Sequence, residues 1–255
     1  MKFLIPGLVV LALPLAAPAG VSAQQEAPTT YVAGTYYRCD AGREQRATEI
    51  MRTVMAPVVD KRMADHSISS WGILAHNTGG PWRRAMYFVG SDLPRLMAAR
   101  DSMVAELQAS HAKEAAEFSS ICPSHDDYIW SYVTASQPAA DVATARPAAG
   151  FSTYQVCHEA TEGLSDEVMK ALYAPIYDKQ VKAGRLHSWA WFSHFVGGKY
   201  RRLLVMDGPS FDSLLAARDS IIAETQAKDP QISAAVAKVC DGHTDYLWDI
   251  VLAKP

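Results

Sequence analysis

Two copies of one short phrase, "CPSHDDYIW" and "CDGHTDYLW", bring together side chains that could carry out chemistry. In each copy a histidine and an aspartate stand two positions apart, His125 with Asp127 and His243 with Asp245. On a β-strand such residues share one face, so the imidazole could act as a base that the carboxylate orients, or both could bind a metal. No nucleophile accompanies either pair, and we favour a structural polar pair over these functional roles.

A second pair of histidines, His76 and His194, precedes a Gly-Gly dipeptide in each half of the chain. We expect both on a strand, on the same side as Leu74 and Phe192. A histidine that faces a cavity can bind haem iron or another metal or position a substrate, whereas at a rim it commonly bonds a loop carbonyl. His76 and His194 are therefore the candidates for catalysis. We predict no metal site and no cofactor, and haem is the one cofactor left open.

Pairs of arginines begin an expected strand in each half, Arg83 with Arg84 and Arg201 with Arg202. Neighbouring strand residues face opposite ways, so one arginine of each pair can reach a cavity and hold an anion. We name Arg84 and Arg202 as these ligand-binding candidates, and the alternative is a solvated arginine beside an aromatic ring.

The second half is richer in aromatic residues at one segment, "WAWFSHF" against "WGILAHN" in the first half. Residues shared by both halves can report only the shared fold, whereas a difference points to a surface or cavity of one half. Trp191 and Phe192 are therefore candidates for contact with a ligand or a protein partner.

Most of these residues recur because the chain carries an internal repeat. Residues 36–133 align without a gap on residues 154–251, and 34 of the 98 pairs are identical. We divide the chain after its first 23 residues into a first repeat (24–133), an Ala/Pro-rich linker (134–150) and a second repeat (151–255).

In each repeat, segments with the apolar spacing of strands and of helices follow one another in the same order. In the first, a β-prone run at 34–39 precedes apolar residues at helical spacing over 50–59, where Pro57 predicts a kink or a break. Two β-prone runs around Gly-Gly, a helix at 93–107, a further alanine-rich helical stretch and the strand "DYIWSYV" complete the unit. The order βαββαβ is the ferredoxin-like plan, so we predict an α+β fold of two tandem ferredoxin-like repeats.

Two further arginines lie in the helical phrase "AARDS" that both repeats share. Arg100 precedes Asp101, and Arg218 precedes Asp219. We expect local ion pairs on the helix surface, which contribute little, and assign these arginines no functional role.

Each repeat contains two cysteines, and their spacing is the same in both repeats. Cys39 ends the first strand and Cys122 just precedes the last strand, which is its antiparallel neighbour in this plan. We predict the disulfides Cys39–Cys122 and Cys157–Cys240, and the alternative is a metal site of Cys39, Cys122 and His125.

The amino terminus predicts export. Residues 1–23 combine Lys2, an apolar core and a small-x-small ending at Ala23, which is the layout of a Sec-type signal peptide. We expect a periplasmic or extracellular protein that touches membranes only peripherally, with a retained signal anchor as the alternative. The formal net charge of −3 lacks the basic excess that nucleic-acid binding requires.

The segments "SSWGILAHNTGGPWRRAMYF", "LMAARDSMVAEL" and "HSWAWFSHFVGGKYRR" resemble the dimeric α+β barrel superfamily, nearest to NIPSNAP-like and EthD-like domains. The resemblance implies that two ferredoxin-like units close a shared barrel, here an intramolecular pseudo-dimer. Members of that superfamily include cofactor-free monooxygenases, haem-binding enzymes and proteins without known activity. The chain carries no catalytic signature of the enzymatic branches, so fold alone assigns no reaction.

From these observations we expect an exported, non-catalytic accessory or binding protein of the cell envelope. Its partner would be a protein of the envelope, and one form of this role is a subunit on the outer face of a membrane complex such as an electron-transport complex. The alternative is a barrel enzyme or carrier, monooxygenase-like or haem-binding, for a small apolar or planar ligand.

Overall fold

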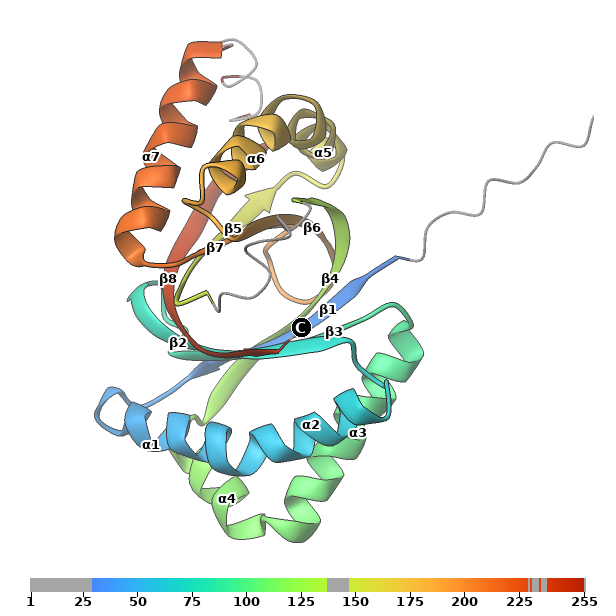
Figure 1. Ribbon diagram of the computed structural model, residues 1–255. Coiled ribbons are helices and arrows are strands. Elements are labelled where there is room, and N and C mark those ends of the chain that lie inside the picture. The colour runs from blue at the N-terminus through green and yellow to red at the C-terminus, as the bar shows by residue number, and fades with distance from the viewer. Residues whose placement is uncertain (1–28, 137–146, 229, 231–233, 235–237, 255) are drawn as a thin grey trace, which may run out of the picture.

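The computed structural model describes residues 29–136, 147–228, 230, 234 and 238–254, which form a mixed α+β structure (Figure 1). The predicted signal peptide and most of the alanine-rich stretch at 231–239 lie outside the described residues. We call residues 29–136 the first half and residues 147–254 the second half.

The strands and helical segments of both halves follow the order βαββαβ. The first half contains β1 (Tyr31–Arg38), a short 3-10 turn (Ala41–Arg43), α1 (Glu44–Ile50), a π-helical turn (Met51–Met55), α2 (Ala56–Ala64), β2 (Ser70–Gly79), β3 (Arg84–Gly90), α3 (Leu93–Ser110), α4 (Ala112–Ile121) and β4 (Ser124–Ala135). The second half contains β5 (Ala149–Cys157), α5 (Glu162–Val168), a π-helical turn (Met169–Tyr173), α6 (Ala174–Lys182), β6 (Ser188–Val196), β7 (Arg202–Gly208), α7 (Phe211–Lys228) and β8 (Cys240–Lys254). The predicted linker is therefore too long, because its first two and last two residues belong to β4 and β5.

The eight strands close into one antiparallel barrel in the order β1-β3-β2-β8-β5-β7-β6-β4. Each half contributes a four-stranded sheet, and the two sheets join edge to edge where β2 pairs with β8 and where β4 pairs with β6. Both of these seams contain register shifts, and such bulges increase the local bend of a strand. Because every sheet edge finds a partner, no strand edge of the barrel is left open.

The Gly-Gly turn of each half packs against the opposite half at a seam. Gly79 has a φ of 127°, and a Cβ there would lie 2.1 Å from the carbonyl oxygen of Asp245 on β8. Gly197 has a φ of 144°, and a Cβ there would lie 2.4 Å from the ring of Tyr128 on β4. The turn thus requires glycine both for its backbone conformation and for the close approach of the other half.

The barrel interior is filled at one end by aromatic side chains from both halves. Trp82 stacks between Tyr36 and Tyr246, with ring centroids at 4.3 Å and 5.2 Å. Such contacts add to the free energy gained by burying the rings. This aromatic cluster comprises Tyr36, Trp82, Tyr128, Trp130, Tyr154, Tyr200, Tyr246 and Trp248.

Helices cover the outer face of the barrel on two opposite sides (Figure 1). In the view of Figure 1, α1 to α4 lie below the barrel and α5 to α7 lie above it. Strand residues that point outward pack on the helices of their own half, as Ile73 and Phe88 do in the first half and Leu204 does in the second. The alternation of strand side chains therefore separates an inner core from two outer cores.

A π-helical turn stands just before the proline in the first helical segment of each half. Met51–Met55 precedes Pro57, and Met169–Tyr173 precedes Pro175. Proline lacks the N–H donor and its ring displaces the carbonyl of the preceding turn, so a wider turn accommodates it without ending the helix. The helix does not break at the proline, and its irregularity is a π-helical turn.

Both predicted disulfides are confirmed. Cys39 bonds to Cys122 and Cys157 bonds to Cys240, each with a sequence separation of 83 residues. Each bridge ties the end of the first strand of a half to the residues that begin its last strand. The alternative metal site is excluded in this state, because its two cysteines are oxidised.

Replacing Cys39 and Cys122 by serine should lower the free energy of unfolding by about 2–5 kcal/mol, because the bridge restricts a long loop of the unfolded chain. Denaturant titration of the non-reduced protein measures the loss. The Cys157→Ser/Cys240→Ser variant is the matched comparison, since its loop has the same length. Unchanged unfolding midpoints in both variants would contradict the expectation.

Candidate functional site

The first half contains a pocket of about 300 Å³ between its sheet and its helices. Its walls come from β1, β3, β4, the π-helical turn, α2, α3 and α4, and most of the lining side chains are apolar. The walls carry three methionines, and unbranched, polarizable methionine side chains adapt to irregular apolar ligands. We call this the sheet–helix pocket; its apolar lining includes Met55, Val58, Val59, Met86, Phe88, Met103, Leu107 and Phe118.

A polar cluster lies at the edge of the sheet–helix pocket. Arg100 of α3 donates from Nη2 to Asp127 Oδ2 at 2.8 Å, and the hydroxyl of Thr35 donates to Asp127 Oδ1 at 2.7 Å. His125 Nε2 lies 3.4 Å from Asp127 Oδ2. Thr35, Arg100 and His125 line the pocket. Asp127 accepts hydrogen bonds from the first two and lies beside the imidazole of the third. The carboxylate therefore fixes a guanidinium at the pocket wall, next to an imidazole.

The expected ion pair between Arg100 and Asp101 is wrong. Arg100 does not stay with Asp101 but crosses to Asp127 on β4. Arg218 does lie near its neighbour Asp219, at 3.9 Å. The available signal was that Arg100, His125 and Asp127 all recur in the second repeat, yet only the packing of α3 on the sheet brings them together.

The equivalent pocket of the second half is smaller, at about 150 Å³. Phe151 lines it where the first half has Ala33, and Tyr177 lines it where the first half has Val59. The guanidinium of Arg218 lies 5.4 Å from the centre of the Phe151 ring. The two halves thus share the residue types of the polar cluster but not its arrangement.

The polar pair of the second half is less well satisfied than that of the first half. His243 Nε2 lies 3.5 Å from Asp245 Oδ2, whereas Asp245 Oδ1 is buried without a hydrogen-bond partner among the described residues. Both His-x-Asp pairs share a strand face as predicted, and the strands turn these residues away from the barrel interior.

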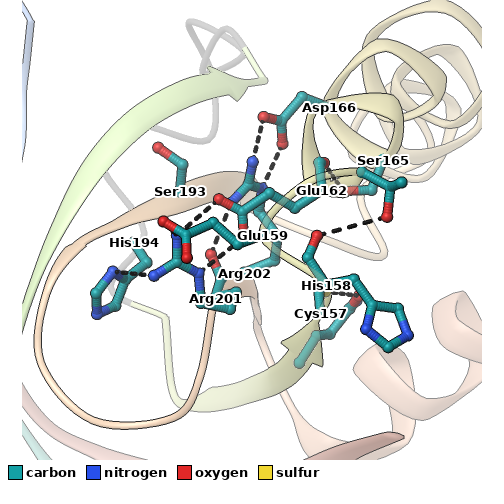
Figure 2. A network of polar contacts seen from close by, with 12 residues as sticks. Cys157, His158, Glu159, Glu162, Ser165, Asp166, Ser193, His194, Arg201 and Arg202 are labelled. Atoms are coloured by element: carbon teal, nitrogen blue, oxygen red, sulfur yellow. Dashed lines mark hydrogen bonds and ion pairs between the residues drawn. The ribbon is translucent and has the colours of Figure 1, made fainter. Parts of the chain in front are cut away.

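Arg202, which we predicted to bind an anion, and its neighbour Arg201 are paired with carboxylates of α5 (Figure 2). Arg202 Nε and Nη2 both donate to Asp166 at 2.7 Å, and Arg201 donates to Glu162 from Nε and Nη2 at 2.8 Å. Burial raises the pKa of Glu162, but Arg201 and Arg202 outweigh it and leave that pKa below its ordinary value. These arginines fasten α5 to the start of β7.

The first half has a parallel clamp. Arg84 is buried, donates from Nε to Thr48 at 2.7 Å and from Nη1 to Glu44 at 3.1 Å, and Arg83 pairs with the same glutamate. The carboxylate that Arg84 holds thus belongs to α1. The role of Arg84 and Arg202 toward an external ligand stays a prediction.

The two candidate catalytic histidines lie against the aromatic cluster. The ring of His76 meets those of Tyr246 and Trp248 edge-on with centroids at 6.2 Å, and His194 meets Tyr128 and Trp130 at 6.3 Å and 6.2 Å. Figure 2 shows His194 beside Arg201, whose Nη1 lies 3.1 Å from Nδ1 of the imidazole. Burial, and next the charge of the adjacent Arg83 or Arg201, lowers the pKa of both histidines.

Trp191 and Phe192 lie inside the protein rather than on its surface, with exposed fractions of 2% and 9%. Trp191 Nε1 donates to Asp166 at 2.7 Å, in the outer core of the second half. Phe192 lines a cavity inside the barrel. Only Phe195 and Val196, at the end of β6, expose apolar side chains of this segment.

Within the residues that the structure describes, no group of three or more His, Cys, Asp or Glu side chains is arranged to hold a metal ion. None of the helices in the same residues has the length and hydrophobicity to cross a membrane.

Solved structures with the same barrel fold resemble this chain. A candidate monooxygenase from Fusobacterium nucleatum subsp. nucleatum gives a TM-score of 0.58 at 10% identity, covering 90% of this chain and 95% of that chain. An anthrone oxidase-like protein gives 0.53 at 12% identity, with 90% and 94% covered. A chlorite dismutase variant from Candidatus Nitrospira defluvii gives 0.52 at 7% identity, with 88% and 91% covered. No protein-family model matches the chain, and no curated protein matches its sequence.

At these identities the likeness establishes the fold alone, which is that of dimeric α+β barrel proteins. The expected barrel fold is thus found, and membership of the superfamily stays a prediction. The expected nearness to NIPSNAP-like and EthD-like domains stays a prediction.

The lowered pKa values of His76 and His194 predict a loss of stability in mild acid. Below the ordinary pKa of 6.5 the unfolded chain binds protons that the folded chain does not, so the free energy of unfolding should fall as the pH drops through 6.5. A His76→Gln/His194→Gln variant should show a flatter decline between pH 7 and about pH 5. Denaturant titrations across this range measure both slopes, and parallel slopes would refute the expectation.

Proposed function

We propose that this chain is an exported binding protein or carrier whose small, mainly apolar ligand occupies the sheet–helix pocket of the first half. One observation carries the proposal: a pocket of about 300 Å³ with an apolar wall ends at the cluster of Arg100, His125 and Asp127. Ligand sites in proteins are typically apolar concavities with a few convergent polar groups. The duplicated but altered pocket of the second half would serve the fold rather than the ligand.

The lining indicates the chemistry of the ligand. Met55, Met86 and Met103 together with two phenylalanine rings suit a planar apolar body. Arg100 uses one nitrogen for Asp127, and a guanidinium has five N–H donors, so further donors remain for a carboxylate or sulfonate of the ligand. We therefore expect a planar apolar molecule with one acidic group.

Catalysis is the second candidate function, and the pairing of His125 with Asp127 favours it. A carboxylate 3.4 Å from Nε2 can orient the imidazole, which suits a general base beside the pocket. The hydroxyls of Thr35 and Ser119 also line the pocket, but among the described residues neither is hydrogen-bonded to His125. The reaction would therefore be a proton transfer on the bound molecule.

Export and the accessory role remain proposals with different support. Two disulfides suit an oxidising compartment such as the periplasm or the exterior of the cell. The proposal of a protein partner in the cell envelope loses the surface that suggested it, because Trp191 and Phe192 are buried.

The internal identity of 34 in 98 residue pairs supports a duplicated gene unit as the origin of both halves.

Filling the sheet–helix pocket should abolish binding of a planar anionic probe. We expect 8-anilinonaphthalene-1-sulfonate to bind the wild-type protein at one saturable site and Met103→Trp to remove that site. Arg100→Leu should weaken binding at least about tenfold, which corresponds to one charge-assisted hydrogen bond. Fluorescence titration measures both effects.

The second half offers matched controls for these variants. Ile221→Trp and Arg218→Leu alter the corresponding positions of the smaller pocket and should leave the affinity unchanged. If these controls weaken binding as much as the first-half variants, the probe reads general surface hydrophobicity and the proposal fails. If the controls bind the probe normally, native mass spectrometry of the gently purified protein would identify the natural ligand from a retained molecule.

A further inference from the structure

A second cavity, of about 190 Å³, lies inside the barrel. It shares no lining residue with the sheet–helix pocket. Most of its lining residues face inward, and Phe151 and Met206 of the second half's outer core also contribute. The aromatic cluster forms its closed end, where Tyr36, Tyr154 and Trp248 are buried. Further along, the walls are aliphatic and include Val32, Leu74, Ala85, Leu203, Val205 and Ile250. We call this space the barrel cavity.

Besides the tyrosines of the aromatic floor, three polar side chains line the cavity. One is Ser152, whose hydroxyl accepts from Trp248 Nε1 at 3.2 Å. The other two are Tyr87 and Asp207. Tyr87 of β3 belongs to the first half and Asp207 of β7 belongs to the second half. Asp207 accepts hydrogen bonds from the backbone N and the hydroxyl of Ser188, at 2.9 Å and 2.8 Å, which hold its carboxylate in place. Burial, and next the charge of Asp207, raises the pKa of Tyr87 to about 12, so the phenol stays protonated.

The repeat shows that the barrel itself does not require these two groups. The counterpart of Tyr87 is Val205, and the counterpart of Asp207 is Val89. Valine stands at each position in the other half, and Ala190 there replaces Gly72, over which the ring of Tyr87 lies. A carboxylate placed in a largely apolar cavity loses hydration, and burial raises the pKa of Asp207 accordingly. A buried polar pair that only one half carries indicates a role in binding.

The barrel cavity opens at the end where this pair lies. Tyr87, Val89, Asp207 and Ile250 retain accessible surface, whereas the lining residues at the aromatic end are buried. A ligand entering from that side would reach the aromatic floor with its apolar body and leave its polar group beside Tyr87 and Asp207.

We propose that the barrel cavity is a second ligand site, independent of the sheet–helix pocket, for a single-ring aromatic molecule with a hydroxyl group. Its size fits, since an apolar protein cavity of about 150 Å³ accommodates benzene. The ring would pack on Tyr36, Tyr154 and Trp248. A hydroxyl both donates and accepts hydrogen bonds, so it can donate to Asp207 and accept from the phenol of Tyr87.

Binding of 4-fluorophenol and of fluorobenzene to the full mature chain tests the proposal, followed by fluorine NMR and calorimetry. We expect both probes to bind at one saturable site, with 4-fluorophenol the tighter. Asp207→Val and Tyr87→Val insert the residues that the other half carries, and each should weaken 4-fluorophenol at least about tenfold while changing fluorobenzene little. Asp207→Asn is the second variant should Asp207→Val fold poorly.

A filling variant separates this site from the sheet–helix pocket. Ala85→Leu, which copies Leu203, should abolish binding of both fluorinated probes and leave 8-anilinonaphthalene-1-sulfonate unaffected. Met103→Trp should do the reverse. The proposal is overturned if neither fluorinated probe binds saturably, if Ala85→Leu leaves their affinity unchanged, or if the Asp207 and Tyr87 variants weaken both probes equally.

Discussion

Closure of the barrel at its two seams is the constraint on which the rest of the structure depends. A four-stranded sheet alone would leave two open edges and one bare apolar face. Pairing β2 with β8 and β4 with β6 satisfies all four edges and buries the inner faces of both sheets together. The Gly-Gly turns and the tyrosines of the repeated phrase meet at these seams, which explains why both halves retain them.

Closure also gives each strand two environments with different chemistry. Inward residues build an aromatic cluster that fills one end of the barrel and leaves a cavity at the other. Outward residues face the helices, where the first half keeps a methionine-lined pocket beside Arg100 and Asp127. The repeated phrase serves both sides at once, because His125 and Asp127 point outward while Tyr128 and Trp130 point inward.

Comparison of the halves separates residues that the fold needs from residues free to serve a ligand. The arginine clamps recur in both halves, as Arg84 with Glu44 and Arg202 with Glu162, and they hold helices in place. Some differences line the cavities, where Phe151 replaces Ala33 and Asp207 replaces Val89. The polar cluster of the sheet–helix pocket uses residue types that both repeats carry, whereas the polar pair of the barrel cavity occurs in a single copy.

Much of the architecture followed from the sequence by itself, because local periodicity and the repeat are properties of neighbouring residues. Element order, strand faces, the hairpin glycines and the pairing of Cys39 with Cys122 were all predictable in this way. The sites were not, because they depend on contacts between distant segments. Only the packing of α3 turns Arg100 from Asp101 toward Asp127, and only barrel closure brings Tyr87 and Asp207, from opposite halves, to one cavity.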